Sequence, residues 1–149
     1  MVDDLHTAGI AVWVTVTTPA EARDAARAGA DALVVQGVEA GAHRGSFDDT
    51  APGDIGLLAL LQLIRAQVAL PLVAAGGIAT AAGVAGVLAA GAVAAALGTA
   101  FMRAREAGTR HPPRRLPVDG TAAQLDRAAV GPIKTAQHIQ YGRFTGAVG

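Results

Sequence analysis

One histidine, His43, lies in a segment whose composition suits catalysis. It stands between Gly41 and Gly45 in the run Gln-Gly-Val-Glu-Ala-Gly-Ala-His-Arg-Gly, which begins at Gln36. Small residues let a backbone approach a flat ligand closely, and an imidazole can accept or release a proton near neutral pH. The run directly follows residues 32–35, an apolar segment typical of a buried strand, and α/β folds place their chemistry at such strand ends. His43 is therefore a candidate general base.

Glycine or small polar residues follow two later apolar segments in the same way. Gly76 and Gly77 come at the end of the segment beginning at Pro71, and Gly98 and Thr99 follow Leu97. Amides in such turns can point at phosphate oxygens without an intervening Cβ, and a following helix adds the positive end of its dipole. The glycines could also simply permit tight turns. Their occurrence at three matching strand ends favours a site for a phosphate-bearing cofactor.

The elements that must position these residues alternate regularly. Residues 10–16 are β-branched and almost wholly apolar, as expected for a strand covered on both faces. Thr18, Pro19 and Glu21 predict a capped helix start, and Gly29 predicts its end. Together the patterns predict strands at 10–16, 32–36, 71–75 and 92–97, and helices from Pro19 toward Gly29, at 55–68 and at 80–90. This order indicates an α/β fold with a parallel sheet and right-handed crossovers.

The helix at 55–68 shows the strongest amphipathic pattern. We expect its buried side to carry Leu57, Leu58, Leu61 and Ile64.

Composition excludes several classes of function. Lys plus Arg equals Asp plus Glu, twelve each, so no net field attracts the chain to nucleic acid or acidic lipid. Aromatic residues make up 3% of the chain, which argues against a surface that stacks bases, and the lack of cysteine excludes a thiolate nucleophile. The start of the chain lacks the pattern of a signal peptide, no run reaches membrane-spanning length, and the remaining histidines are too widely spaced for a metal site. We therefore expect a cytoplasmic protein.

Taken together, the three glycine-rich motifs resemble those of the nitronate monooxygenase family, the 2-nitropropane dioxygenase-like flavoproteins. The family pattern is roughly Gln-Gly-x-Glu-Ala-Gly-Gly-His-Arg-Gly, then Ala-Ala-Gly-Gly-Ile, then Gln-x-Gly-Thr-x-Phe, and the match runs from about Ile10 to Gly108. Family members are FMN-dependent (β/α)8 barrels that oxidise alkyl nitronates or nitroalkanes with O2. The resemblance implies that His43 is the catalytic base and that FMN is bound by Gln36, Gly41, Gly77, Ala96, Leu97, Gly98 and Thr99.

This chemistry agrees with the residue types. A neutral imidazole can take the α-proton from a nitroalkane, and a flavin can then supply the oxidation. We expect Arg44 to anchor the loop or face solvent. Glu39 could pair with Arg44 or orient His43, and the sequence favours neither role.

The chain also departs from the family. A complete barrel needs roughly 250 residues, whereas four βα units correspond by motif order to strands five to eight, the C-terminal half. Two unpaired strand edges would remain. We therefore expect the chain alone to be a weak or inactive enzyme. It could form a homo-oligomer, pair with a complementing half-barrel, or be a remnant of a longer gene. Ala42 and Ala96 replace a glycine and a glutamine, and from Thr109 the composition changes, so we divide the chain into a partial FMN-binding barrel, 1–108, and a divergent, loosely structured tail, 109–149.

Three other interpretations remain open. A flavin-dependent enoyl-acyl carrier protein reductase shares the barrel and a similar glycine-histidine loop. A non-catalytic half-barrel could bind flavin or phosphate and act through a partner. A barrel isomerase or synthase acting on sugar phosphates would explain the glycine turns but would leave His43 unused.

Overall fold

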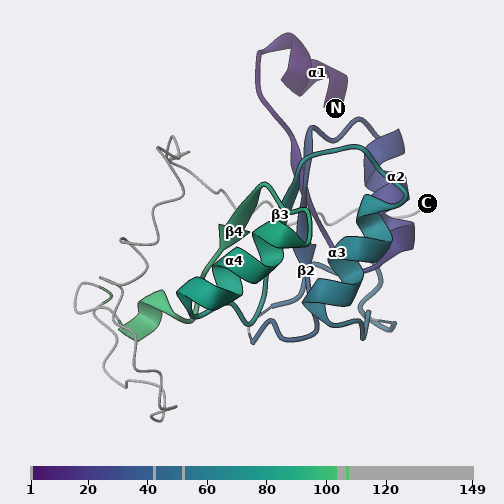
Figure 1. The fold of residues 1–149 in the computed structure, drawn as a ribbon. Helices are drawn as coiled ribbons and strands as arrows, with labels where there is room; N and C mark the ends of the chain where they lie inside the picture. Colours follow the sequence, from purple (N-terminus) through teal and green to yellow (C-terminus); the bar gives the residue numbers. More distant parts are fainter. Residues whose placement is uncertain (1, 42, 52, 104–106, 108–149) are drawn as a thin grey trace.

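The computed structural model describes residues 2–41, 43–51, 53–103 and 107. These residues form one sheet of parallel strands in the order β1-β2-β3-β4, with helices between successive strands (Figure 1). The strands are β1 (Trp13–Val16), β2 (Ala32–Gln36), β3 (Leu72–Ala75) and β4 (Ala94–Ala96). The helices are α1 (Val2–Thr7), α2 (Pro19–Arg27), α3 (Leu57–Arg65) and α4 (Ala81–Ala89), followed by a 3-10 turn, η1 (Phe101–Arg103). The predicted α/β alternation is confirmed, and the fold is a partial (β/α) barrel.

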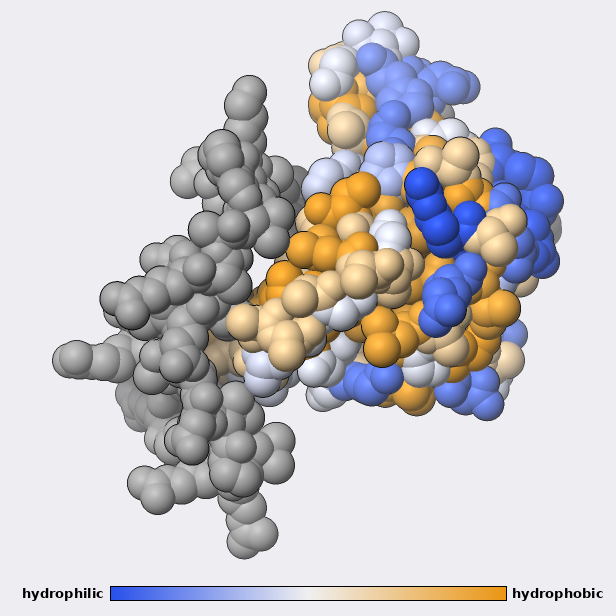
Figure 2. All heavy atoms as spheres, in the orientation of Figure 1, coloured by the Kyte–Doolittle hydropathy of each residue, from blue (hydrophilic) through white to orange (hydrophobic). Residues whose placement is uncertain are grey.

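The core lies between one face of the sheet and the three helices that connect its strands. α2 packs on β1, α3 on β2 and β3, and α4 on β4. Alternate strand residues such as Val16, Leu33 and Leu72 are fully buried there. Figure 2 shows apolar side chains over α4, a helix built from alanine, glycine, valine and leucine.

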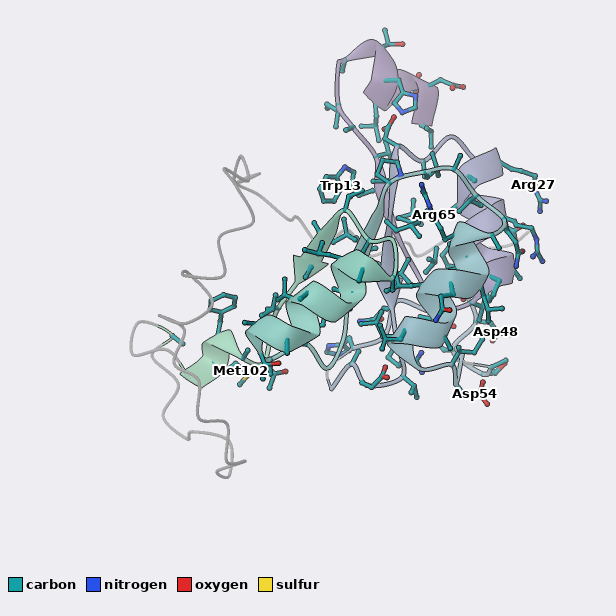
Figure 3. The ribbon with its side chains drawn as sticks, in the orientation of Figure 1. Trp13, Arg27, Asp48, Asp54, Arg65 and Met102 are labelled. Atoms are coloured by element: carbon teal, nitrogen blue, oxygen red, sulfur yellow. The ribbon has the colours of Figure 1, made fainter. Side chains whose placement is uncertain are left out.

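The other face of the sheet is less covered than the sequence suggested. β1 was expected to be covered on both faces, but Trp13 is 48% exposed, and Thr15 and Val34 on the same face are only half-buried (Figure 3). β1 also begins at Trp13 and not at Ile10, which is itself 51% exposed. Among the described residues no further strand pairs with β1 or β4. Among the described residues, this face is therefore only partly covered, and both edges of the sheet lack a strand partner.

The helix ends follow local chemistry. Thr18 and Glu21 form the predicted capping box, and Gly29, with φ at +91°, follows the last turn of α2. The buried face of α3 consists of Leu57, Leu60, Leu61 and Ile64. The expectation that Leu58 lies on this face was wrong, because Leu58 is 52% exposed and Leu60 takes the buried position.

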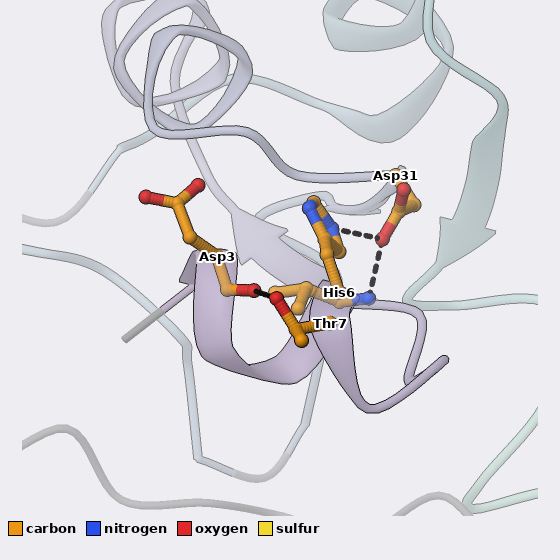
Figure 4. Close-up of polar contacts among 5 residues, drawn as sticks. Asp3, His6, Thr7 and Asp31 are labelled. Atoms are coloured by element: carbon orange, nitrogen blue, oxygen red, sulfur yellow. Dashed lines mark hydrogen bonds and ion pairs between the residues drawn. The ribbon is translucent and has the colours of Figure 1, made fainter.

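α1 lies beyond the amino ends of the strands and is tied there by Asp31. The Asp31 carboxylate accepts a hydrogen bond from the Val12 amide at 2.6 Å and lies 3.0 Å from His6 Nε2 (Figure 4). The Val12 amide and then His6 lower the pKa of Asp31 below its ordinary value of 3.8. This pair marks the end of the sheet away from the histidine loop.

In the part of the chain that the structure describes, no helix is long and apolar enough to cross a membrane. The predicted tail, 109–149, lies outside the described residues.

Candidate functional site

The three predicted motifs follow the carboxyl ends of three adjacent parallel strands, β2, β3 and β4. Gln36, Ala75 and Ala96 occupy the same register position on β2, β3 and β4. Because the strands are parallel neighbours, their carboxyl ends lie side by side and the segments that follow them begin together. The interpretation of the glycines as one site is therefore consistent with the fold.

The side chain of Gln36 holds the histidine loop. Its Nε2 donates to the His43 carbonyl at 3.1 Å, and its Oε1 accepts from the Gly45 amide at 2.8 Å. The residue predicted to contact FMN thus uses two of its hydrogen-bonding groups on the main chain of the loop. His43 itself is exposed at this edge.

Gly45 packs directly on the sheet. A Cβ at this position would lie 2.6 Å from Thr15 Cγ2 and 2.8 Å from Thr15 Cβ, both closer than real contacts allow. Because Thr15 is fixed in β1, a side chain here would push the loop outward. The absence of a Cβ therefore sets the height of the loop above the sheet.

A buried carboxylate secures the exit of the same loop. Glu21 is 8% exposed, and its Oε1 accepts from Ser46 Oγ at 3.2 Å and from the Phe47 amide at 2.9 Å. Its Oε2 accepts from the main-chain amides of Thr17 and Thr18 and from the Thr17 hydroxyl. Sequence reasoning identified Glu21 only as a capping residue, because no local spacing signals a contact 25 positions away.

The two charged residues near His43 have structural partners. Arg44 Nη1 donates to the Gly53 carbonyl, so Arg44 anchors the loop, as predicted; its Nε and Nη2 are buried without a partner among the described residues. Both carboxylate oxygens of Glu39 accept from the Leu57 amide, at 3.0 and 3.1 Å. Glu39 thus takes neither of the two roles that the sequence left open, the pairing with Arg44 or the orientation of His43. It caps α3, whose N-cap residue Gly56 has no side chain.

The turn after β3 supports the loop after β2. Gly76 and Gly77 have φ of +107° and +68°, and a Cβ on Gly77 would lie 2.8 Å from Glu39 Cβ. A Cβ on Gly76 would lie 3.1 Å from the Ala40 amide nitrogen. These glycines are therefore needed for the turn itself and for packing between the two segments.

The remaining predicted cofactor residues fit an approaching ligand. A Cβ on Gly41 or Gly98 would meet nothing within 4 Å, and Thr99 is exposed beside Gly98. Leu97 is partly buried, and its side chain packs against the core. Open space at two glycines, on the segments that follow β2 and β4 on either side of β3, suits the close approach of a mononucleotide. Within the described residues no cluster of three histidine, cysteine or carboxylate groups could hold a metal.

Solved structures resemble this fold closely. The chain superposes on nitroalkane oxidase from Streptomyces ansochromogenes with a TM-score of 0.63 and 52% identity, over 66% of this chain and 29% of that one. FabK from Thermotoga maritima gives a TM-score of 0.58 and 35% identity, over 66% of this chain and 29% of that one.

Sequence relatives agree. A nitronate monooxygenase from Pseudomonas aeruginosa is 48% identical over 104 residues, which is 69% of this chain and 30% of the relative. This chain thus spans about 30% of the length of that enzyme. The family described as nitronate monooxygenase matches residues 1–131. The chain therefore belongs to the nitronate monooxygenase family.

Proposed function

We propose that this chain forms the part of an FMN-dependent nitronate monooxygenase that carries the catalytic base and one wall of the cofactor site. Its substrates would be alkyl nitronates or nitroalkanes together with O2. The observation that carries the proposal is the placement of His43, exposed on an anchored loop, at the edge where the ends of β2, β3 and β4 align.

His43 would act as the general base. Its neutral imidazole would accept the α-proton of a nitroalkane, and the resulting charge would be shared with the nitro group as a nitronate. Exposure of the ring leaves it free to reach a substrate, while the anchors of the loop limit how far it moves. Preorganisation of this kind reduces the entropy lost when substrate and base align.

FMN would be held mainly by main-chain groups at this edge. Gly41, Gly77, Gly98 and Thr99, with the main chain of Ala96 and Leu97, would receive its phosphate and ring, and Gln36 would contribute an amide. Bound FMN would supply electron acceptance and the reaction with O2. The open space at Gly41 and Gly98 leaves room for these contacts.

A companion would complete the barrel. The accessible face of the sheet and its edges at β1 and β4 could be covered by a second copy or by a complementing half-barrel. We place the assembled enzyme in the cytoplasm. Activity of the chain alone is expected to be weak.

Absorbance spectroscopy tests the proposal. The purified protein should turn yellow with FMN, and the flavin should bleach when propionate 3-nitronate is added without oxygen. His43→Ala should slow the oxidation of a neutral nitroalkane far more than the oxidation of a preformed nitronate, because only the former needs a base. His6→Ala, at the opposite end of the sheet, is the matched control.

Two outcomes would redirect the assignment. Oxidation of NADPH with an enoyl thioester, and none with nitronate, would favour a reductase. FMN binding with no turnover, even at elevated protein concentration where a companion copy would assemble, would favour a non-catalytic flavin-binding half-barrel.

A further inference from the structure

We propose that Gln36 is a positioning residue, whose side-chain amide fixes the main chain on both sides of Arg44 and thereby orients His43. This inference rests on the proposed function, in which His43 is the base. It assigns to Gln36 a task that acts through the loop, beyond contact with FMN.

The geometry is that of a strand pairing made by a side chain. The His43 carbonyl and the Gly45 amide belong to residues two apart, so they point the same way in an extended segment. A primary amide presents one donor and one acceptor side by side, as a neighbouring strand would. Distances of 3.1 Å and 2.8 Å are ordinary for such bonds.

The orientation of the Gln36 amide follows from its partners. A carbonyl can only accept and a main-chain N–H can only donate, so Nε2 must face His43 and Oε1 must face Gly45. One N–H and one lone pair of the amide remain, so contact with a cofactor is compatible with this task.

Gln36 lies in a rigid strand, whereas the residue that it positions has little support of its own. Gln36 is the last residue of β2 and is paired in register with Ala75 of β3. The His43 side chain is exposed, so its own packing contributes little to its placement. Farther along, the loop keeps its own attachments, Gly45 to Thr15 and Phe47 to Glu21. Removal of the amide should therefore loosen the loop near His43 without releasing its exit.

A looser loop should slow the reaction, because proton transfer requires the base to lie within about 2.6–3.2 Å of the proton's donor atom. A misplacement of about 1 Å can lower a rate by about a hundredfold. Gln36→Leu removes both hydrogen bonds, the one to the His43 carbonyl and the one from the Gly45 amide. Gln36→Glu keeps an acceptor for Gly45 but sets an oxygen against the His43 carbonyl. Val34→Ala, two residues earlier on the same face of β2, controls for damage to the strand.

Backbone NMR of the full chain gives the decisive readout. In Gln36→Leu the Gly45 amide should exchange its hydrogen at least about tenfold faster, because its acceptor is gone. The order parameter of the His43 amide should fall from about 0.85 toward 0.6 in both Gln36 variants. Val34→Ala should change neither. If Gln36→Leu destabilises the fold, Gln36→Glu still tests the hydrogen bond to the His43 carbonyl.

Kinetic constants then separate positioning from cofactor binding. Positioning predicts that kcat for a nitroalkane, measured at saturating FMN, still falls about 10- to 100-fold in the Gln36 variants, whereas a role confined to FMN contact would raise the Kd for FMN and leave this kcat unchanged. An unchanged rate of hydrogen exchange at Gly45 and an unchanged order parameter at His43 in both variants would overturn the positioning role of Gln36. Full turnover of a nitroalkane by His43→Ala would instead overturn the proposed function, and it would not affect the NMR test of Gln36.

Discussion

Replacement of Glu21 by glutamine tests whether a buried carboxylate holds the histidine loop on the barrel. Glu21 is 8% exposed and accepts five hydrogen bonds, three from residues 17 and 18 and two from Ser46 and Phe47. Glutamine has the same shape, so packing is preserved. It has only one carbonyl oxygen, however, and its NH2 group must face one of the two sets of donors.

The less costly orientation places that NH2 group toward the loop. Ser46 can adapt, because its hydroxyl can donate to the Asp48 carbonyl at 2.8 Å and accept from the new amide. The Phe47 amide cannot adapt, since it is only a donor. Loss of one charge-assisted bond, with an N–H left facing another donor, should lower the free energy of unfolding by about 2–3 kcal/mol.

Urea unfolding measures this effect. With a slope of about 1–3 kcal/mol per molar, the midpoint should fall by about 0.7–3 M. Asp24→Asn on the same helix is the matched control, because Asp24 is exposed and pairs with Arg27 one turn away; its effect should stay below about 1 kcal/mol. Hydrogen exchange at Phe47 should accelerate in Glu21→Gln alone. Equal midpoints for the two variants would refute the role assigned to Glu21.

Three further predictions concern residues around this frame. Gly45→Ala should lower the free energy of unfolding by about 1–3 kcal/mol, because its Cβ would overlap Thr15, whereas Gly41→Ala, with open space, should stay within about 0.5 kcal/mol; equal thermal midpoints would contradict this. Glu39→Gln should cost about 0.3–1 kcal/mol through the amino end of α3, less at 1 M salt, and a salt-independent loss in urea titrations would count against a charge effect. The pKa of Asp31 is lower in the folded protein, so its contribution to stability is present above about pH 3.8 and is lost as pH falls through the folded pKa. The difference in the free energy of unfolding between wild type and Asp31→Asn should therefore shrink below about pH 3.8. A difference that grew there would contradict this role of Asp31.

Local patterns in the sequence were sufficient to predict the frame of the fold. The alternation of strands and helices, the capping box at Thr18 and the turn at Gly29 depend on residues a few positions apart. Hydrophobic periodicity predicted three of the four buried residues of α3. The fourth is Leu60, whereas Leu58, which was expected to be buried, is exposed. The parallel order of the strands then predicts that the glycine motifs meet.

The contacts that hold the loop could not be predicted in this way. Gln36 reaches forward seven and nine residues, and Glu21 reaches 25 and 26 residues, to main-chain groups that any residue type would provide. Glu39 illustrates the same point, because charge alone suggested Arg44 as its partner, whereas the fold places it at the start of α3. A side chain that binds main chain leaves no complementary residue in the sequence to reveal it.

Titration of 15N-labelled protein with FMN, followed by two-dimensional NMR, tests the central claim most directly. The account predicts that the amides of Gly41, Gly77 and Gly98, on three separate strand ends, shift together with a single Kd, and that the ring of His43 shifts with them. Amides near His6 and Asp31, at the far end of the sheet, should stay unchanged. Shifts confined to one strand end, different Kd values among the three glycines, or a response centred on His6 would contradict a single mononucleotide site beside His43.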